Sequence, residues 1–270
     1  MASTHKSVEL PPELEWDIVE YAARIHPETA HTLALVAPRF RTWINTFLYS
    51  SLVLDYPYTR PALLLRTITD RDPDFIARTV KRVYITTSVA YADAARVLAA
   101  CSGATDITCW TRPAPEFPGL ACVKRLSFDA SSLLSAPKLL PSLTHLDLVN
   151  PPPGTTMESW MALFAGLPAL THVAFGNLYA QEPVDHRPLI PLFLALLSGE
   201  TGHDLKMLVA VSDDEDFVPF LYKEVDDPRV VVMPQFNHPR TLMEYWQDVQ
   251  TGGLDFWGVA ERLPLRKSKA

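Results

Sequence analysis

Glycine is scarce in this sequence, and the glycine-rich motifs that accompany catalysis or nucleotide binding are missing. Only 10 of the 270 residues are glycine, and the chain contains no Gly-x-Gly-x-x-Gly, Walker lysine loop, Gly-x-Ser-x-Gly or His-Glu-x-x-His pattern. Loops that bring phosphate against the backbone need glycine, because a side chain would block the approach. We therefore expect no cofactor, no catalytic residue and no enzymatic activity.

Cysteine and long apolar runs are also scarce. The three cysteines, Cys101, Cys109 and Cys122, are odd in number and include no Cys-x-x-Cys pair, which argues against a disulfide framework and a cysteine zinc site. The longest apolar run, 188–197, is about half of what a bilayer requires. Residues 1–7 are polar, whereas a secretory leader carries an apolar segment. We expect an intracellular protein, cytoplasmic or nuclear, without membrane contact.

Clustered positive charge is missing as well. The formal net charge is -7, from 24 Lys and Arg against 31 Asp and Glu, and the basic residues gather only at 262–269. Binding to nucleic acid needs clustered cations that displace counterions from phosphate, so we expect no nucleic-acid partner. The 48% of hydrophobic residues indicates instead a globular protein with a sizeable core.

What the sequence does contain begins with three helical segments in its first fifty residues. An apolar stripe with helical spacing is formed by Leu14, Ile18, Ala22 and Ile25. A second helical segment must end before Pro38, because proline lacks an N–H donor and disfavours helical angles in the residue before it. Apolar spacing predicts a third helix over 40–48, and residues 52–54 form a short extended exit.

These segments together resemble the F-box module. The resemblance rests on the order and spacing of Leu10-Pro11-Pro12-Glu13-Leu14, Ile18-Val19, Leu35-Val36, Arg39-Phe40, Trp43 and Leu48-Tyr49. In that family the module binds a Skp-type adaptor, and so a cullin-based ubiquitin ligase, through an apolar helical surface. The resemblance implies adaptor contact at Leu10, Pro11, Leu14, Ile18, Val36 and Trp43. The alternative is a plain helical cap in which these side chains form ordinary core.

Behind this segment an apolar-x-x-apolar-x-apolar pattern recurs, at spacings of roughly 20 to 35 residues. Its copies are Val80-Val83-Ile85, Ala104-Ile107-Cys109, Val123-Leu126-Phe128, Leu143-Leu146-Leu148, Leu170-Val173-Phe175 and Leu205-Leu208-Ala210, with a further strand at 229–233. Such a period is typical of leucine-rich repeats, in which each unit adds one strand to a parallel sheet.

The segments between these strands predict the connections that lead from one parallel strand to the next. Helical returns are expected at 91–100, 157–167, 189–197 and 217–225. Capping boxes at Thr155–Glu158 and Ser212–Glu215 would begin two of them. Residues 113–118 and 131–141 are expected to be irregular.

Alternation along each strand predicts a concave outer face. Its central column would be Tyr84, Thr108, Ser127, Asp147, Ala174, Val209 and Val232. A protein partner is expected to contact this face at Arg82, Tyr84, Thr108, Trp110, Arg125, Ser127, His145, Asp147 and His172. Exposed aromatic and arginine side chains often dominate such interfaces, although an ordinary solvated sheet face is an equal alternative.

Two places in the sequence carry potential metal ligands, and metal binding is not expected at either. His145 and His172 should be neighbours across parallel strands, with Asp129 and Asp147 nearby, which is a conceivable metal cluster. Exposed polar ladders on sheets are far commoner, however. The acidic run 213–216 is explained by helix capping without a cation.

The C-terminal part is rich in aromatic residues, which predicts a closing helix over the open end of the array. These residues are Tyr245, Trp246, Leu254, Phe256 and Trp257. With its F-box-like start, the chain resembles, over nearly its whole length, a class of fungal F-box proteins with degenerate leucine-rich-type repeats, and residues 256–261 are similar to their closing helix.

We therefore predict an α/β fold, in which a three-helix F-box-like module precedes a short leucine-rich-repeat-like solenoid with a parallel sheet and outer helices. The predicted divisions are a disordered N-terminus (1–9), the module (10–54), the array (55–237), a helical cap (238–263) and a basic tail (264–270). The resemblance implies a substrate-recruiting adaptor of a cullin-based ubiquitin ligase, which binds a protein target through the concave face. The alternative is a ligase-independent interaction scaffold in which the module only caps the repeats.

Overall fold

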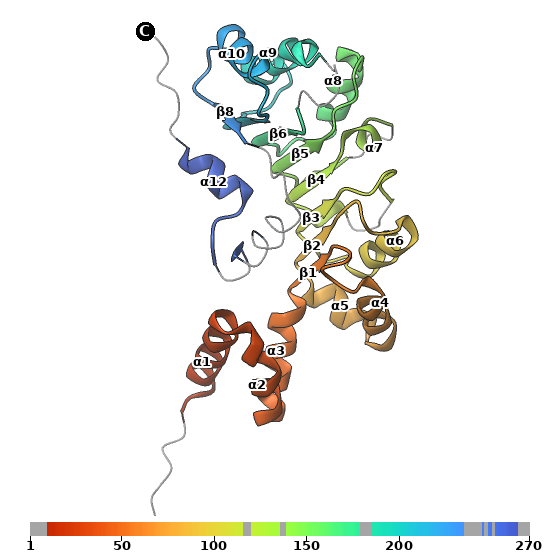
Figure 1. Ribbon diagram of the computed structural model, residues 1–270, viewed down its shortest axis with the longest axis vertical. Helices are drawn as coiled ribbons and strands as arrows, with labels where there is room; N and C mark the ends of the chain where they lie inside the picture. The colour runs from red at the N-terminus through yellow and green to blue at the C-terminus, as the bar shows by residue number, and fades with distance from the viewer. Residues whose placement is uncertain are drawn as a thin grey trace, which may run out of the picture.

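The computed structural model is an α/β protein with one open, eight-stranded, all-parallel sheet behind an N-terminal group of helices (Figure 1). The structure describes residues 10–115, 120–135, 139–178, 185–234, 245, 248–249 and 252–263. The predicted N-terminus (1–9), the basic tail (264–270) and Trp246 of the predicted cap lie outside these residues. None of the helices in the described ranges has the length and apolar character needed to span a membrane.

Three helices, which we call the head, precede the sheet. They are α1 (Pro12–Ile25), α2 (Ala30–Val36) and α3 (Pro38–Tyr49), with a short 3-10 turn, η1 (Pro27–Thr29), before α2. Pro12 and Pro38 each occupy a first turn, where a missing N–H costs little, and Ala37 is extended as expected before a proline. The three predicted helical segments are therefore confirmed.

The strands follow one another across the sheet in chain order. They are β1 (Ser51–Leu54), β2 (Arg82–Ile85), β3 (Asp106–Cys109), β4 (Arg125–Asp129), β5 (His145–Val149), β6 (His172–Gly176), β7 (Met207–Val211) and β8 (Val230–Met233). The expected parallel sheet is confirmed. Residues 52–54 are more than an extended exit, because Ser51 pairs with Arg82 and the segment forms the first strand.

Helices cover one face of this sheet. They are α4 (Pro61–Asp70), α5 (Pro73–Thr79), α6 (Tyr91–Ala100), α7 (Ala130–Ser135), α8 (Met157–Ala165), α9 (Ile190–Ser198) and α10 (Phe217–Glu224), with short 3-10 turns η2 (Leu120–Cys122) and η3 (Arg187–Leu189). The predicted returns α6, α8, α9 and α10 are confirmed. The prediction that 131–141 is irregular is wrong at its start, where Asp129 accepts a hydrogen bond from the Ser132 N–H and helps to begin α7.

The two predicted capping boxes are displaced from their expected positions. Thr156, not Thr155, is the N-cap of α8, and its Oγ1 accepts from the Ser159 N–H at 3.3 Å. At α10 the carboxylate of Asp214 accepts from the N–H groups of Asp216 and Phe217, at 2.9 Å each. The acidic run 213–216 thus has the capping use expected of it.

The main core lies between the sheet and the connecting helices. The predicted inward positions Val83, Ile107, Leu126, Leu146, Val173 and Leu208 all belong to it. Phe164, Phe175 and Phe193 fill its centre and are fully buried. Each buried side chain of this size stabilises the fold by about 1.5–3 kcal/mol, so the side chains on this face hold the strands together.

The prediction for the last strand is wrong by one residue. Val231, not Val232, pairs with Val209 and faces outward, while Val230 pairs with Leu208 and faces the core. The local sequence is a run of valines, which gives no alternation to fix the register. A shift of one residue exchanges the two faces of a strand.

A final helix, α12 (Phe256–Arg262), lies on the opposite face of the sheet from the connecting helices (Figure 1). It buries Trp257 and Ala260 against Met207, Val209 and Val231. The sequence led us to expect this helix at the open end of the array. It lies across the face instead, because the outward side chains of the last strands are apolar and need cover from water.

Candidate functional sites

The first candidate site is the outer surface of the head. Of the six predicted adaptor-contact residues, Leu10, Pro11, Leu14, Ile18 and Val36 are exposed. Trp43 is not, because it packs inside the head with Trp16 and Phe40, at ring-centroid distances of 5.5 Å. Its ring therefore supports the helices that carry Leu14, Ile18 and Val36.

The apolar stripe of α1 faces solvent. The core of the head is formed by Val19, Ala23, Ala30 and Ile44, whereas Leu14 is 49% and Ile18 56% exposed. The reading of this stripe as ordinary core is wrong, because α1 turns a neighbouring face inward.

Three further apolar residues of the head are exposed, although we did not assign them to adaptor contact. These are Tyr21, Ile25 and Leu35, of which Leu35 is 86% exposed. The pairing of Leu35 with Val36 in the motif was the available sequence signal.

The second candidate site is the sheet face opposite the connecting helices. The predicted columns are in register, so that Arg82, Asp106, Arg125, His145 and His172 lie side by side on successive strands. The nine predicted partner-contact residues do not form an open surface, however. Tyr84 and Thr108 are buried, and the other seven are half-buried.

The covered part of this face contains a partly open cavity of about 170 Å³. Among the described residues, five aromatic ones line it: Tyr84, Trp110, Tyr245, Phe256 and Trp257. The charged residues of this described lining are Asp106, Asp147, Asp255 and Arg125. Cavities of about 150 Å³ hold a molecule the size of benzene, so the space accommodates a small ligand or one side chain of a larger partner. Three carboxyl groups against one guanidinium favour a cationic occupant.

A chain of hydrogen bonds ends at Asp147 in this cavity. The Trp110 Nε1–H donates to Ser127 Oγ at 2.8 Å, and the Ser127 hydroxyl donates to Asp147 Oδ2 at 2.6 Å. Oδ1 of Asp147 is buried and has no hydrogen-bond partner among the described residues. Burial raises the pKa of Asp147 to about 6, although the hydrogen bond from Ser127 acts in the opposite direction. This carboxyl group can therefore still accept a hydrogen bond from an occupant.

Arg125 connects the sheet to the helix that covers it. Its guanidinium donates to the carboxylate of Asp255 and lies 3.6 Å from the carboxylate of Asp106. Asp255 is also the N-cap of α12, and its Oδ1 accepts from the Gly258 N–H at 2.8 Å. The Phe256 N–H donates to the hydroxyl of Tyr245, which lines the same cavity. The start of α12 is thus fixed over β4.

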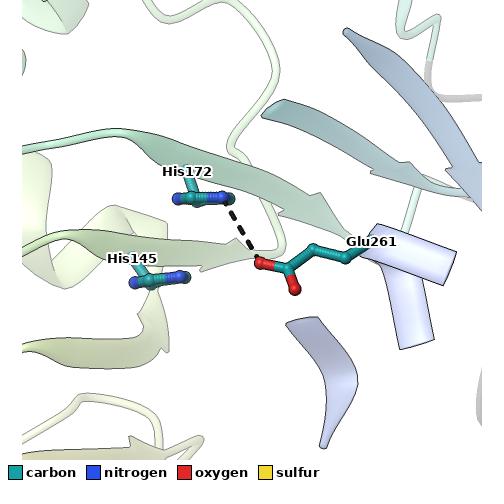
Figure 2. Close-up of side chains that lie close together, drawn as sticks. All are labelled: His145, His172 and Glu261. Atoms are coloured by element: carbon teal, nitrogen blue, oxygen red, sulfur yellow. Dashed lines mark ion pairs between the residues drawn. The ribbon is translucent and has the colours of Figure 1, made fainter. Parts of the chain in front are cut away.

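His145 and His172 lie under the same helix (Figure 2). Their rings are stacked, with centroids 4.2 Å apart and planes 6° from parallel, and Trp257 contacts both rings. Glu261 of α12 lies 3.8 Å from His172 Nε2. Neither histidine lines the cavity that contains Asp147. The metal cluster of both histidines with Asp147 that the sequence made conceivable is therefore not formed, because Asp147 faces a different space.

Comparison with known proteins adds no family to these observations. No protein-family model matches the sequence, and no curated protein matches it. The two candidate sites are therefore described by their residues alone. They are an apolar surface on the head, and a cavity between the sheet and α12 that is lined by acidic and aromatic residues.

Proposed function

We propose that this protein is a two-ended adaptor, whose head binds a Skp-type adaptor of a cullin-based ubiquitin ligase and whose sheet binds a protein target. The observation that carries the proposal is the outward apolar stripe of α1, together with the exposed Leu35 and Val36 at the end of α2. Exposed apolar patches on helices are typical of surfaces that dock a partner. The F-box-like spacing supports a Skp-type adaptor as that partner.

The target side of the proposal uses the cavity under α12. The open concave face expected for target binding is largely covered, so recognition is concentrated in a space that admits one side chain. A lysine or arginine side chain suits this space, because its cationic group can pair with Asp147 and pack against the aromatic walls. We expect targets to present a basic residue there.

Co-purification with a Skp-type adaptor tests the head. The full chain should retain the co-expressed adaptor, and the double variant Leu14→Asp, Ile18→Asp should lose it. Leu194→Asp on α9 is the matched control, because Leu194 is exposed to a similar extent, 46% against 49% for Leu14. If the wild-type chain retains no adaptor, or the double variant retains as much as the control, the ligase role is wrong. Retention of target binding in such a protein would favour the scaffold.

Selection from a random peptide library tests the target side separately. Peptides that bind the full chain should be enriched in Lys or Arg, and the enrichment should disappear for Asp147→Asn. Asp185→Asn is the control, because Asp185 is an exposed aspartate in the described part of the chain, away from the cavity lining. Equal enrichment on Asp147→Asn and Asp185→Asn would show that Asp147 does not select the target.

A further inference from the structure

Three metal-ligating side chains from three different elements meet under α12 (Figure 2). They are His145 of β5, His172 of β6 and Glu261 of α12, and each offers a ligand atom within 4.8 Å of the others. The His172 side chain is 12% exposed and that of Glu261 is 55% exposed, so the cluster opens to solvent on one side. Two imidazoles and one carboxylate are a common ligand set for zinc in proteins.

A threonine hydroxyl lies beside Nδ1 of each ring. Thr144 Oγ1 lies 2.8 Å from Nδ1 of His145 and 3.1 Å from the Lys124 carbonyl oxygen. When this hydroxyl donates to the carbonyl, it accepts from Nδ1–H of His145. The same arrangement occurs one strand further on, where Thr171 Oγ1 lies 2.8 Å from Nδ1 of His172 and 3.2 Å from the Thr144 carbonyl oxygen.

With the protons on Nδ1, both neutral imidazoles have an unprotonated Nε2 near the carboxylate of Glu261. Three acceptor atoms thus lie close together without a donor among them, which is unfavourable unless a cation is shared by them.

We propose that His145, His172 and Glu261 bind a divalent transition-metal ion of the zinc type, which fastens α12 to β5 and β6. Thr144 and Thr171, which contact Nδ1 of each ring, would be the outer partners that leave Nε2 available, an arrangement common around zinc-bound histidines. Water would complete the coordination on the open side. The stacked rings must turn toward each other about χ2 to share the ion, and this torsion is soft. None of the three ligands belongs to the head or lines the cavity.

Zinc titration of the chelator-treated full chain tests the proposal. Zn²⁺ should raise the melting temperature and slow hydrogen exchange in residues 256–262, because it joins α12 to the sheet. Mg²⁺ should do neither, because it prefers oxygen ligands. Co²⁺ should give visible absorption bands without the near-ultraviolet band of thiolate ligation, which separates this site from binding by cysteine.

Matched variants identify the ligands. His172→Gln and Glu261→Gln should each weaken Zn²⁺ binding by at least about tenfold, and Thr144→Val by about tenfold, the range seen when outer partners are removed. His31→Gln on the head should bind as tightly as the wild type, since His31 is exposed and lies outside the cluster. Unchanged Zn²⁺ affinity in His172→Gln, or unchanged exchange in α12 of the wild type, would overturn the proposal. Either result would show that a proton alone bridges His172 and Glu261.

Discussion

The guanidinium of Arg125 on β4 donates a hydrogen bond to Asp255, the residue that caps α12, across 130 positions of the chain. Trp257 and Ala260 then continue the contact over β6, β7 and β8. The helix is therefore fixed by an ion pair at its start and by apolar packing along its length. The ion pair and the apolar packing can be removed by different mutations, so that the contribution of each to the position of α12 can be measured separately.

Replacing Arg125 with alanine should loosen α12 more than it destabilises the protein. The Arg125 side chain is 40% exposed, so solvent screens the pair and the free energy of unfolding should fall by no more than about 1 kcal/mol. Hydrogen exchange in residues 256–262 should nevertheless become faster, because local opening no longer breaks the ion pair. Arg187→Ala, which removes an exposed pair with Asp185, is the control. Unchanged exchange in α12 would contradict the role of Arg125.

Two isoleucines of the head should differ sharply in their contribution to stability. Ile44 is 1% exposed and Ile18 is 56% exposed. Ile44→Ala should lower the free energy of unfolding of the head by about 2–5 kcal/mol, because it leaves a cavity. Ile18→Ala should change it by less than about 0.5 kcal/mol. Urea unfolding followed by circular dichroism measures both, and similar losses would mean that Ile18 is part of the core.

The three cysteines should react at very different rates with iodoacetamide at pH 8. Burial raises the pKa of Cys101 to about 12 and also raises that of Cys109, against the opposing hydrogen bond with Thr111. Only the thiolate is nucleophilic, so both thiols should react on the order of a hundredfold more slowly than the exposed Cys122. Mass spectrometry locates the label, with urea-unfolded protein as the control. Rapid labelling of Cys101 in the folded protein would show that the end of α6 opens readily.

Asp147 should make the folded protein more stable at low pH. Its pKa rises from 3.8 to about 6 on folding, so the folded state binds the proton more tightly. This contribution is present in full below pH 3.8 and is lost as the pH rises to about 6. Between pH 4 and 7 the wild type should therefore lose up to about 3 kcal/mol relative to Asp147→Asn.

Urea unfolding of both proteins, with a chelator present, measures this difference. Comparing the two proteins removes the opposite dependence expected from His145, whose pKa is lowered. It also removes any effect of Arg125, Asp106 and Asp255, which line the same cavity. Parallel stability curves would show that Asp147 titrates as an ordinary carboxyl group.

The sheet could be predicted from the sequence because its signal is local. Leu126 and Phe128 alternate with Ser127, and this alternation alone assigns each side chain to a face. The same rule failed at β8, where Val230, Val231 and Val232 are chemically identical. The helix α7 was missed because its first turn depends on a contact of Asp129 rather than on an apolar period.

The position of α12 over the sheet could not be predicted in the same way. Its position depends on a property of several strands together, since Ala174, Val209 and Val231 make an apolar surface only when they stand side by side. The cavity and the cluster of His145, His172 and Glu261 both follow from that position. The outward direction of the α1 stripe was likewise undecided by periodicity, which shows that a face is apolar but not what covers it.

The chain order of the strands has a consequence for how the protein unfolds. In this sheet each strand pairs only with its neighbours in sequence. Strands at either end can therefore unfold one at a time while the rest of the sheet stays folded. The helix α12 contacts both β4 and β8, because Asp255 pairs with Arg125 of β4 and Trp257 packs in one apolar cluster with Val231 of β8. We expect this span to melt as a single cooperative unit, and the strands nearest the head to fray independently of it.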